Sequence, residues 1–183
     1  MLNNPKAEAP AYRGLAQAYA SIKHTNGLQG VVAKLTPMVK AEPTNYAASA
    51  GLAQAYRELG DTAHATQTLD QMVAKPNVNA SGLLQAAEEY AALRDFAKLE
   101  STLEKLVQVV PGSPEGWYDL AALKSTMGKT GEALAPLKKA IELSNSRQKQ
   151  NQKGRDLLVE AQKDPRFNPL HTNPEFTKLV SSK

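Results

Sequence analysis

Few residues in this sequence have the types and the spacing that catalysis or metal binding requires. The three histidines, His24, His64 and His171, lie far apart, and no pair has the i, i+4 spacing of a helical zinc site. The chain has no cysteine and no Gly-x-Ser-x-Gly turn, so it lacks thiolate ligands and the common nucleophiles. The adjacent Glu88 and Glu89 point in different directions on a helix, which argues against a carboxylate dyad. We therefore expect no enzymatic activity, no metal and no cofactor.

Two short motifs resemble functional signatures, but each has a simpler structural interpretation. The Gly-Lys-Thr sequence at 128–130 matches the end of a phosphate-binding loop, yet that loop needs a glycine at position 123, which is a leucine. These residues align with 60–62, so a turn between two helices is favoured. Asn79-Ala80-Ser81 fits a glycosylation acceptor, but it opens a predicted helix, and we interpret Asn79 as its N-cap.

Basic residues gather near position 150, where they could contact nucleic acid or an anionic membrane surface. The stretch is diluted by glutamines and asparagines, and Asp156 and Glu160 follow it, so a solvated terminal helix is favoured. Aromatic residues make up 5% of the chain, which leaves little material for base stacking. The basic residues are Arg147, Lys149, Lys153 and Arg155.

The composition is that of a folded, soluble protein. The 183 residues are 42% hydrophobic and 22% charged, with a net charge of +4. No run approaches the roughly 18 apolar residues that a membrane helix needs, so we expect no membrane insertion. The absence of cysteine does not identify the compartment, and we favour the cytoplasm over the periplasm.

Three stretches of the sequence, beginning at Tyr46, Ala80 and Pro114, repeat one another with a period of 34 residues. Each reads as two amphipathic helices separated by a turn, because apolar residues recur with i, i+3, i+4, i+7 spacing. Small residues at one column would let helices approach closely. Aligned positions include Leu52, Ala86 and Leu120; Ala53, Ala87 and Ala121; and Leu69, Leu103 and Leu137.

A further unit lies upstream, with one irregularity. Residues 14–19 repeat residues 51–56 letter for letter, but 37 positions earlier, whereas Val31 and Leu35 keep the 34-residue register with the next unit. The three extra residues are therefore expected in a loop around Lys23–Gly30. Pro37 falls inside a predicted second helix, where we expect a kink or a late helix start.

The period, the two-helix unit and the aligned columns resemble those of tetratricopeptide repeat proteins, here of bacterial type. The matching residues are Trp117, Leu120, Leu52, Tyr56, Tyr90, Ala65, Ala133 and Pro111, although alanine replaces the glycine after the leucine and leucine replaces the later phenylalanine. The resemblance implies an all-α fold, a right-handed α-solenoid of antiparallel helix pairs. We expect a single domain, 1–183, with repeats at 9–45, 46–79, 80–113 and 114–147 and a C-terminal capping helix and tail at 148–183.

The sequence also supports predictions for the two ends of the chain. Residues 2–9 resemble the end of a preceding repeat, so we expect a piece of a longer polypeptide, with a short N-terminal arm as the alternative. At the other end we expect a terminal helix at 146–163, an extended link at 164–170 and a short helix from Pro174 capped by Asn173. Apolar residues of this segment should cover the open end of the stack: Phe167, Leu170, Phe176, Leu179 and Val180.

The resemblance implies that the first helix of each repeat lines a concave groove, which holds a peptide or protein segment. Small and amide side chains dominate there, and only the first unit could imitate the carboxylate clamp of some relatives. The alternative is that these side chains only solvate a groove that binds nothing. The expected groove residues are Arg13, Gln17, Ala50, Gln54, Arg57, Leu84, Glu88, Tyr118 and Ala122.

These features favour a non-catalytic scaffold for protein–protein interaction, acting as a monomer or weak dimer. The first alternative is a regulatory or assembly domain at the C-terminus of a larger bacterial protein, including a membrane-anchored one. Nucleic-acid binding is a third hypothesis, and we do not expect a nucleic-acid partner.

Overall fold

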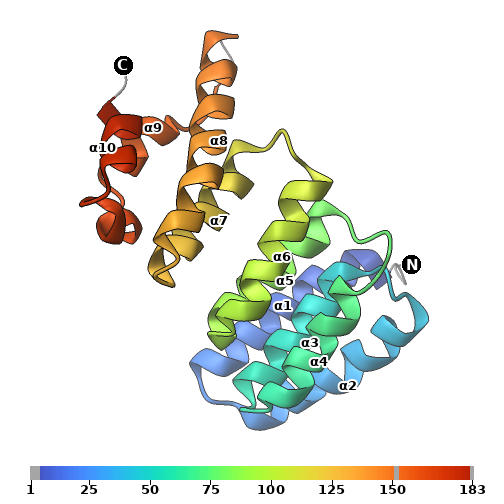
Figure 1. Ribbon diagram of the computed structural model, residues 1–183. Helices are drawn as coiled ribbons and strands as arrows, with labels where there is room; N and C mark the ends of the chain where they lie inside the picture. Colours follow the sequence, from blue (N-terminus) through green and yellow to red (C-terminus); the bar gives the residue numbers. More distant parts are fainter. Residues whose placement is uncertain (1–4, 151–152, 182–183) are drawn as a thin grey trace. The chain divides into compact units, whose positions relative to one another are not determined.

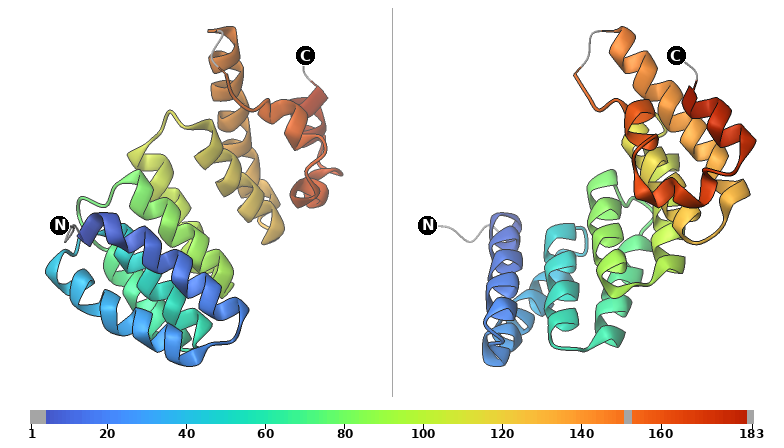
Figure 2. Two further views of the ribbon diagram at one scale, coloured as in Figure 1. Left: turned by 180° about the vertical axis from the view of Figure 1, so that it is seen from behind. Right: turned by 90° about the vertical axis from the view of Figure 1, so that its left-hand side faces the viewer.

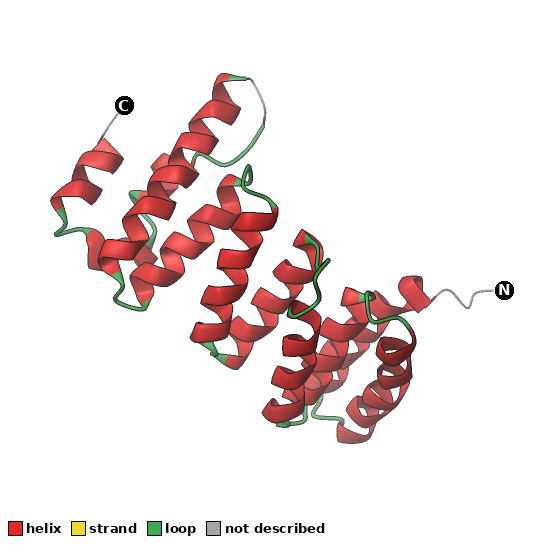
Figure 3. Ribbon diagram, turned by 45° about the vertical axis from the view of Figure 1, so that its right-hand side comes forward, coloured by secondary structure: helices red, strands yellow, loops and turns green. Residues whose placement is uncertain are grey.

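The computed structural model describes residues 5–150 and 153–181, and every regular element in this part of the chain is a helix (Figure 3). The chain divides into two compact units, Met1–Thr102 and Leu103–Lys183, with the division inside α6. The elements are α1 (Pro5–Ser21), α2 (Thr25–Ala41), α3 (Tyr46–Glu58), α4 (Thr62–Val73), α5 (Ala80–Leu93), α6 (Phe96–Val109), α7 (Pro114–Thr126), α8 (Thr130–Lys149), α9 (Leu157–Ala161), the 3₁₀ helix η1 (Pro165–Leu170) and α10 (Pro174–Ser181) (Figure 1).

Consecutive helices pack as antiparallel pairs, which confirms the all-α solenoid that the sequence predicts. In the first unit α1 packs on both α2 and α3, and α3 packs on α4 and α5 (Figure 2). In the second unit α7 packs on α8. Helix α1 begins at Pro5, four residues before the expected start of the first repeat, and residues 2–4 of the expected preceding repeat lie outside the described residues.

The turn inside each pair has the same geometry. A residue in the left-handed region ends the first helix, and the next residue donates its N–H to the carbonyl five positions earlier, as in a Schellman motif. The left-handed residues are Lys23, Gly60, Arg94 and Gly128, separated by 37, 34 and 34 positions. The corresponding N–H···O distances are 2.8 Å (His24 to Tyr19), 2.9 Å (Asp61 to Tyr56), 3.0 Å (Asp95 to Tyr90) and 2.9 Å (Lys129 to Lys124).

The three extra residues of the first repeat lie in a helix, so the expected longer loop at Lys23–Gly30 is wrong. His24 accepts a hydrogen bond from the Gly27 N–H at 2.8 Å and caps α2, as Asp61 caps α4. The first turn is therefore as short as the others, and α2 has 17 residues against 12 in α4. Pro37 neither ends α2 nor delays its start.

Aliphatic residues from α1, α2 and α3 form one core cluster of the first unit, as the periodicity predicts. Small residues occur where helices approach closely, and Ala53 and Ala87 are both buried. The buried members of the cluster are Ala16, Leu28, Val31, Leu35, Ala48, Leu52 and Ala55.

The C-terminal segment of the second unit differs from the expected single helix at 146–163. Helix α8 ends at Lys149, and α9 has only five residues. Between them the Ser144 hydroxyl donates to the Arg155 carbonyl at 2.7 Å and accepts from the Leu157 N–H at 3.3 Å, which holds the returning chain against α8. Residues 165–170 form a 3₁₀ helix in place of the expected extended link.

The remaining expectations for this segment are confirmed. Asn173 accepts the Glu175 N–H at 2.9 Å at the start of α10. Phe167, Leu170 and Phe176 are at most 2% exposed and pack into the core that α7 and α8 form. Because these side chains cover apolar residues that α7 and α8 alone would leave open, the segment closes the second unit.

We expect Gly82→Ala to destabilise the first unit, because α3 and α5 approach closely at this glycine. A Cβ at position 82 would lie 2.8 Å from Cγ of the buried Tyr46 ring, whose hydroxyl donates to the Asn77 carbonyl at 3.2 Å. Overpacking outweighs the helix propensity that alanine gains, so thermal or urea unfolding should show a net loss of about 1–2 kcal/mol. The control is Gly14→Ala in α1, where nothing lies within 4 Å. This variant should gain about 0.5–1 kcal/mol, and equal effects at both sites would contradict the packing.

Candidate functional site

The first helices of the first three pairs, α1, α3 and α5, pack on one another in the first unit, and their shared side carries the expected binding residues. We call this side the α1–α3–α5 face and define it by Arg13, Gln17, Gln54, Arg57, Leu84, Glu88 and Glu89. Gln17, Leu84 and Glu88 are exposed, Arg13 and Arg57 are half-buried, and Gln54 is buried. Seven of the nine expected groove residues, Ala50 included, thus lie on these three helices of the first unit.

An ion-pair network connects the three helices of this face. Nη2 of Arg13 on α1 lies 2.7 Å from Oε2 of Glu88 and 3.4 Å from Oε1 of Glu89, both on α5. Nε of Arg57 on α3 donates to Oε2 of Glu89 at 3.2 Å, and its Nη1 lies 2.8 Å from Oε1 of Glu58. Carboxylates therefore hold the guanidinium groups of both arginines in fixed orientations.

Glu89 is the centre of this network, although the repeat pattern predicts no binding role for it. Its side chain is 4% exposed, and burial raises its pKa although Arg57 and Arg13 act in the opposite direction. A signal was present in the repeat: the aligned residues Ala55 and Leu123 are apolar and buried. A carboxylate in a column of core residues indicates a buried charge that needs a partner.

Gln54 is the one predicted amide that is inaccessible, with 7% of its surface exposed. Its Oε1 atom is buried and accepts no hydrogen bond from any described residue. The expectation that Ala50 faces a groove is wrong, because Ala50 is fully buried, and so is Ala122 in the second unit. Both alanines lie on sides of their helices that pack against neighbours.

The expectation that Tyr118 faces an open groove is wrong. It is fully buried in the second unit, where its hydroxyl donates to Oδ2 of Asp164 at 3.0 Å and its ring meets the edge of Phe167 at a centroid distance of 5.3 Å. Burial and the Asp164 carboxylate raise the pKa of Tyr118. The C-terminal segment covers this residue, and the repeat pattern alone could not show that.

The basic stretch near position 150 has internal partners. Nη1 of Arg147 donates to Oε1 of Glu115 at 2.7 Å, and the Arg155 guanidinium pairs with Glu160. Both arginines thus have acidic partners within the second unit. Within residues 5–150 and 153–181 no three acidic or histidine side chains gather where they could hold a metal ion. No helix among the same residues has the length and apolar character needed to cross a bilayer.

Comparison with known proteins agrees with this architecture. A tetratricopeptide repeat family model matches residues 114–147, which begin with α7 and end within α8. A search of curated proteins gives no match.

Solved structures extend the likeness over almost the whole chain. The TPR-like repeats of a kinesin light chain-like protein from Podosopora anserina share 18% identity at a TM-score of 0.61, covering 98% of this chain and 94% of that one. MamA shares 14% identity at a TM-score of 0.52, covering 87% and 88%. At these identities the likeness concerns the fold. The family model thus shows a tetratricopeptide repeat at 114–147, and for the rest of the chain the solved structures and the recurring turns show the fold of such repeats.

Proposed function

We propose that the chain is a non-catalytic scaffold for protein–protein interaction and that its α1–α3–α5 face binds an extended segment of a partner protein. The observation that carries this proposal is the pair Leu84 and Glu88, one turn apart on α5. Leu84 is 47% exposed, and the Glu88 side chain is 61% exposed. An exposed apolar residue beside an exposed charge on a rigid helix is suited to anchoring a partner.

The ion-pair network that includes Glu88 supports the same function. Arg13 engages one oxygen of Glu88, and the other oxygen, Oε1, has no partner among the described residues. This oxygen can accept a hydrogen bond from a backbone N–H or a basic side chain of the partner. Because Arg13 already holds Glu88 in place, binding requires little further ordering of its side chain.

The proposal is tested with peptides selected from a random dodecamer display library on the intact chain. Their dissociation constants are then measured by calorimetry for the Leu84→Ala/Glu88→Ala variant. Loss of an apolar anchor and a charge-assisted hydrogen bond should weaken binding at least about tenfold. The matched control is Val159→Ala/Glu142→Ala, which removes an exposed apolar side chain and an exposed carboxylate from the second unit.

The control should bind as the unmodified chain does, since neither residue belongs to the α1–α3–α5 face. Peptides that bind the Leu84/Glu88 variant with unchanged affinity would contradict the proposal for this face. Circular dichroism of both variants verifies that the helices are intact, because both Leu84 and Glu88 are exposed and their loss should not affect folding.

A further inference from the structure

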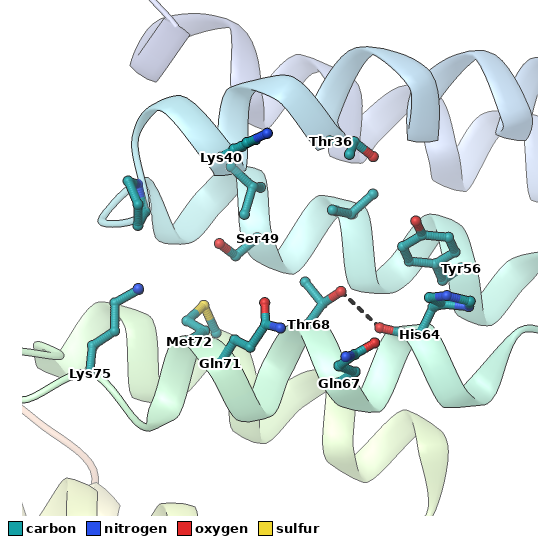
Figure 4. A pocket seen from close by; sticks show the side chains of 13 residues that line it. Thr36, Lys40, Ser49, Tyr56, His64, Gln67, Thr68, Gln71, Met72 and Lys75 are labelled. Carbon is teal, nitrogen blue, oxygen red and sulfur yellow. Dashed lines mark hydrogen bonds between the residues drawn. The ribbon is translucent and has the colours of Figure 1, made fainter.

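A pocket of about 380 Å³ lies in the first unit between the second helices of the first two pairs (Figure 4). Helix α2 forms one wall, α4 forms the other, and α3 forms the base. The volume is within the range of sites that bind small molecules and short peptide segments. None of its lining residues belongs to the α1–α3–α5 face.

The charge of the pocket is positive at one end. Lys40 and Lys75 lie toward this end in Figure 4, and Tyr56 and His64 lie toward the other. No aspartate or glutamate lines the pocket, and among the described residues neither lysine forms an ion pair. The C-termini of α2 and α4 add roughly half a negative charge each, which is less than the two ammonium charges together.

The opposite end of the pocket has its own internal partners. Nδ1 of His64 lies 2.6 Å from Oδ2 of Asp61, and the His64 ring stacks on Tyr56 at a centroid distance of 5.1 Å. The pocket is thus asymmetric: its unneutralised charge is confined to the lysine end. A ligand with one acidic end would bind in a single direction.

A row of polar side chains runs along α4 to the lysine end. Gln67, Gln71 and Lys75 follow at intervals of four residues and all line the pocket. The two amides make no hydrogen bond among the described residues, whereas the Thr36 and Thr68 hydroxyls donate to carbonyls of their own helices at 2.8 Å. Four helical residues advance about 6 Å along the axis, close to the two-residue repeat of about 6.6 Å in an extended chain. The amides are therefore spaced to bind successive peptide groups on one side of a strand.

The pocket also has an apolar surface, to which α3 and both walls contribute. Leu52 and Met72 are 5% and 1% exposed, and Val39 and Pro43 complete this surface. Alternate side chains of an extended segment point to opposite faces, so one set could pack on this surface while the backbone contacts the amides. A free anion such as phosphate would leave these apolar and amide groups unused.

We propose that this pocket is a second binding site, which takes an extended peptide segment with an aspartate or glutamate side chain at the Lys40–Lys75 end. The segment runs parallel to α4. Its backbone hydrogen-bonds to Gln67 and Gln71, and its apolar side chain packs on Leu52 and Met72. Its acidic side chain pairs with the two ammonium groups, neither of which forms an ion pair with a described residue.

The test uses a labelled, N-acetylated and C-amidated hexapeptide of sequence Ser-Leu-Ser-Leu-Glu-Glu, with fluorescence polarisation and amide chemical shifts as readouts. It should bind the full chain and shift the amide signals of α2 and α4. Lys40→Gln/Lys75→Gln should weaken binding at least about tenfold, since each charge-assisted hydrogen bond contributes more than a neutral one. Lys34→Gln, on the exposed side of α2 and outside the pocket, is the matched control and should leave the affinity unchanged.

Two further peptides separate the alternatives. The hexapeptide with glutamine at both acidic positions should bind at least about tenfold more weakly. Binding of this neutral peptide only when its C-terminus is a free acid would overturn the assignment to an acidic side chain. Equal affinity of the Lys40/Lys75 variant and the unmodified chain would overturn the site itself. The Leu84→Ala/Glu88→Ala variant should bind the hexapeptide normally, so this result is independent of the α1–α3–α5 face.

Discussion

Replacing Phe167 with alanine should lower the free energy of unfolding of the second unit by about 3–5 kcal/mol. The ring is fully buried and meets the Tyr118 ring edge-on, with Phe176 at a centroid distance of 6.1 Å. Its removal would leave a cavity between α7 and the C-terminal segment, and the aromatic contacts would be lost as well. The effect is large because this ring lies in the core that joins the short C-terminal helices to the α7–α8 pair.

The measurement uses the only tryptophan of the chain as a local probe. Trp117 packs against the same core cluster, so its fluorescence in urea reports the second unit, and far-UV circular dichroism reports all helices. The Phe167→Ala variant should shift the fluorescence transition to lower urea. Val159→Ala, which truncates an exposed side chain of α9, should change stability by less than about 0.5 kcal/mol. A loss below about 1 kcal/mol for Phe167→Ala would show that the C-terminal segment does not contribute to this core.

The helix pairs could be predicted from sequence because their signals are local. Aliphatic residues at helical spacing recur in each unit, two of the four turns contain a glycine, and a residue with a capping side chain follows three of the four turns. Even the turns without glycine, at Lys23 and Arg94, keep the left-handed conformation, since the surrounding packing fixes the backbone there. The extra residues of the first repeat were misplaced because a histidine is an uncommon N-cap.

The binding face was predicted only in part, because only some of its features follow from local sequence signals. Arg13, Arg57 and Glu88 occupy helix positions that the resemblance to tetratricopeptide repeats places on one side of the first helices. Their mutual ion pairs span up to 76 positions of sequence, and no local pattern specifies them. Tyr118 was misassigned because its cover comes from Asp164 and Phe167, beyond the last repeat. Burial by a non-repeating segment cannot be read from the period.

The pocket between α2 and α4 could be predicted from sequence only in part, because it depends on local spacing and also on how the helices pack. The spacing of Gln67, Gln71 and Lys75 is visible in the sequence, but Lys40 reaches the same end only because two second helices lie side by side. The α1–α3–α5 face lies on first helices alone, whereas the pocket lies between two second helices and shares only α3 with that face. Their different charge distributions predict different partners, because unneutralised positive charge occurs in the pocket and an exposed carboxylate on the α1–α3–α5 face.

The second large effect is expected for Arg57→Met, which should destabilise the first unit by about 3 kcal/mol near neutral pH. Arg57 is the main partner of the buried Glu89 carboxylate, and loss of one member of a buried pair leaves an uncompensated charge. Arg13 remains 3.4 Å from Glu89, which places the expected cost at the low end of the usual range of about 3–5 kcal/mol. Urea unfolding followed by circular dichroism measures the change, with Lys34→Met on the exposed side of α2 as the control.

The cost should depend on pH in a defined direction. Burial already raises the folded-state pKa of Glu89 above its ordinary value of 4.5, and loss of Arg57 should raise this pKa further. Between the unfolded and folded pKa values the folded protein binds more protons, so stability falls as the pH rises through this window. The destabilisation by Arg57→Met should therefore be small near about pH 4, where Glu89 is largely protonated in the folded state of both proteins, and reach its full size above the folded-state pKa of the variant.

A second variant separates this electrostatic effect from lost packing of the arginine side chain. Adding Glu89→Gln to Arg57→Met removes the buried charge, so the double variant should be more stable than Arg57→Met near neutral pH and should lose the extra pH dependence. If Glu89→Gln restores nothing, the cost of Arg57→Met comes from the contacts of its alkyl chain, and Glu89 is not the charge that the network holds. If the double variant recovers most of the stability, the buried carboxylate is what fixes Arg13 and Arg57, and through Arg13 the exposed Glu88, at the α1–α3–α5 face.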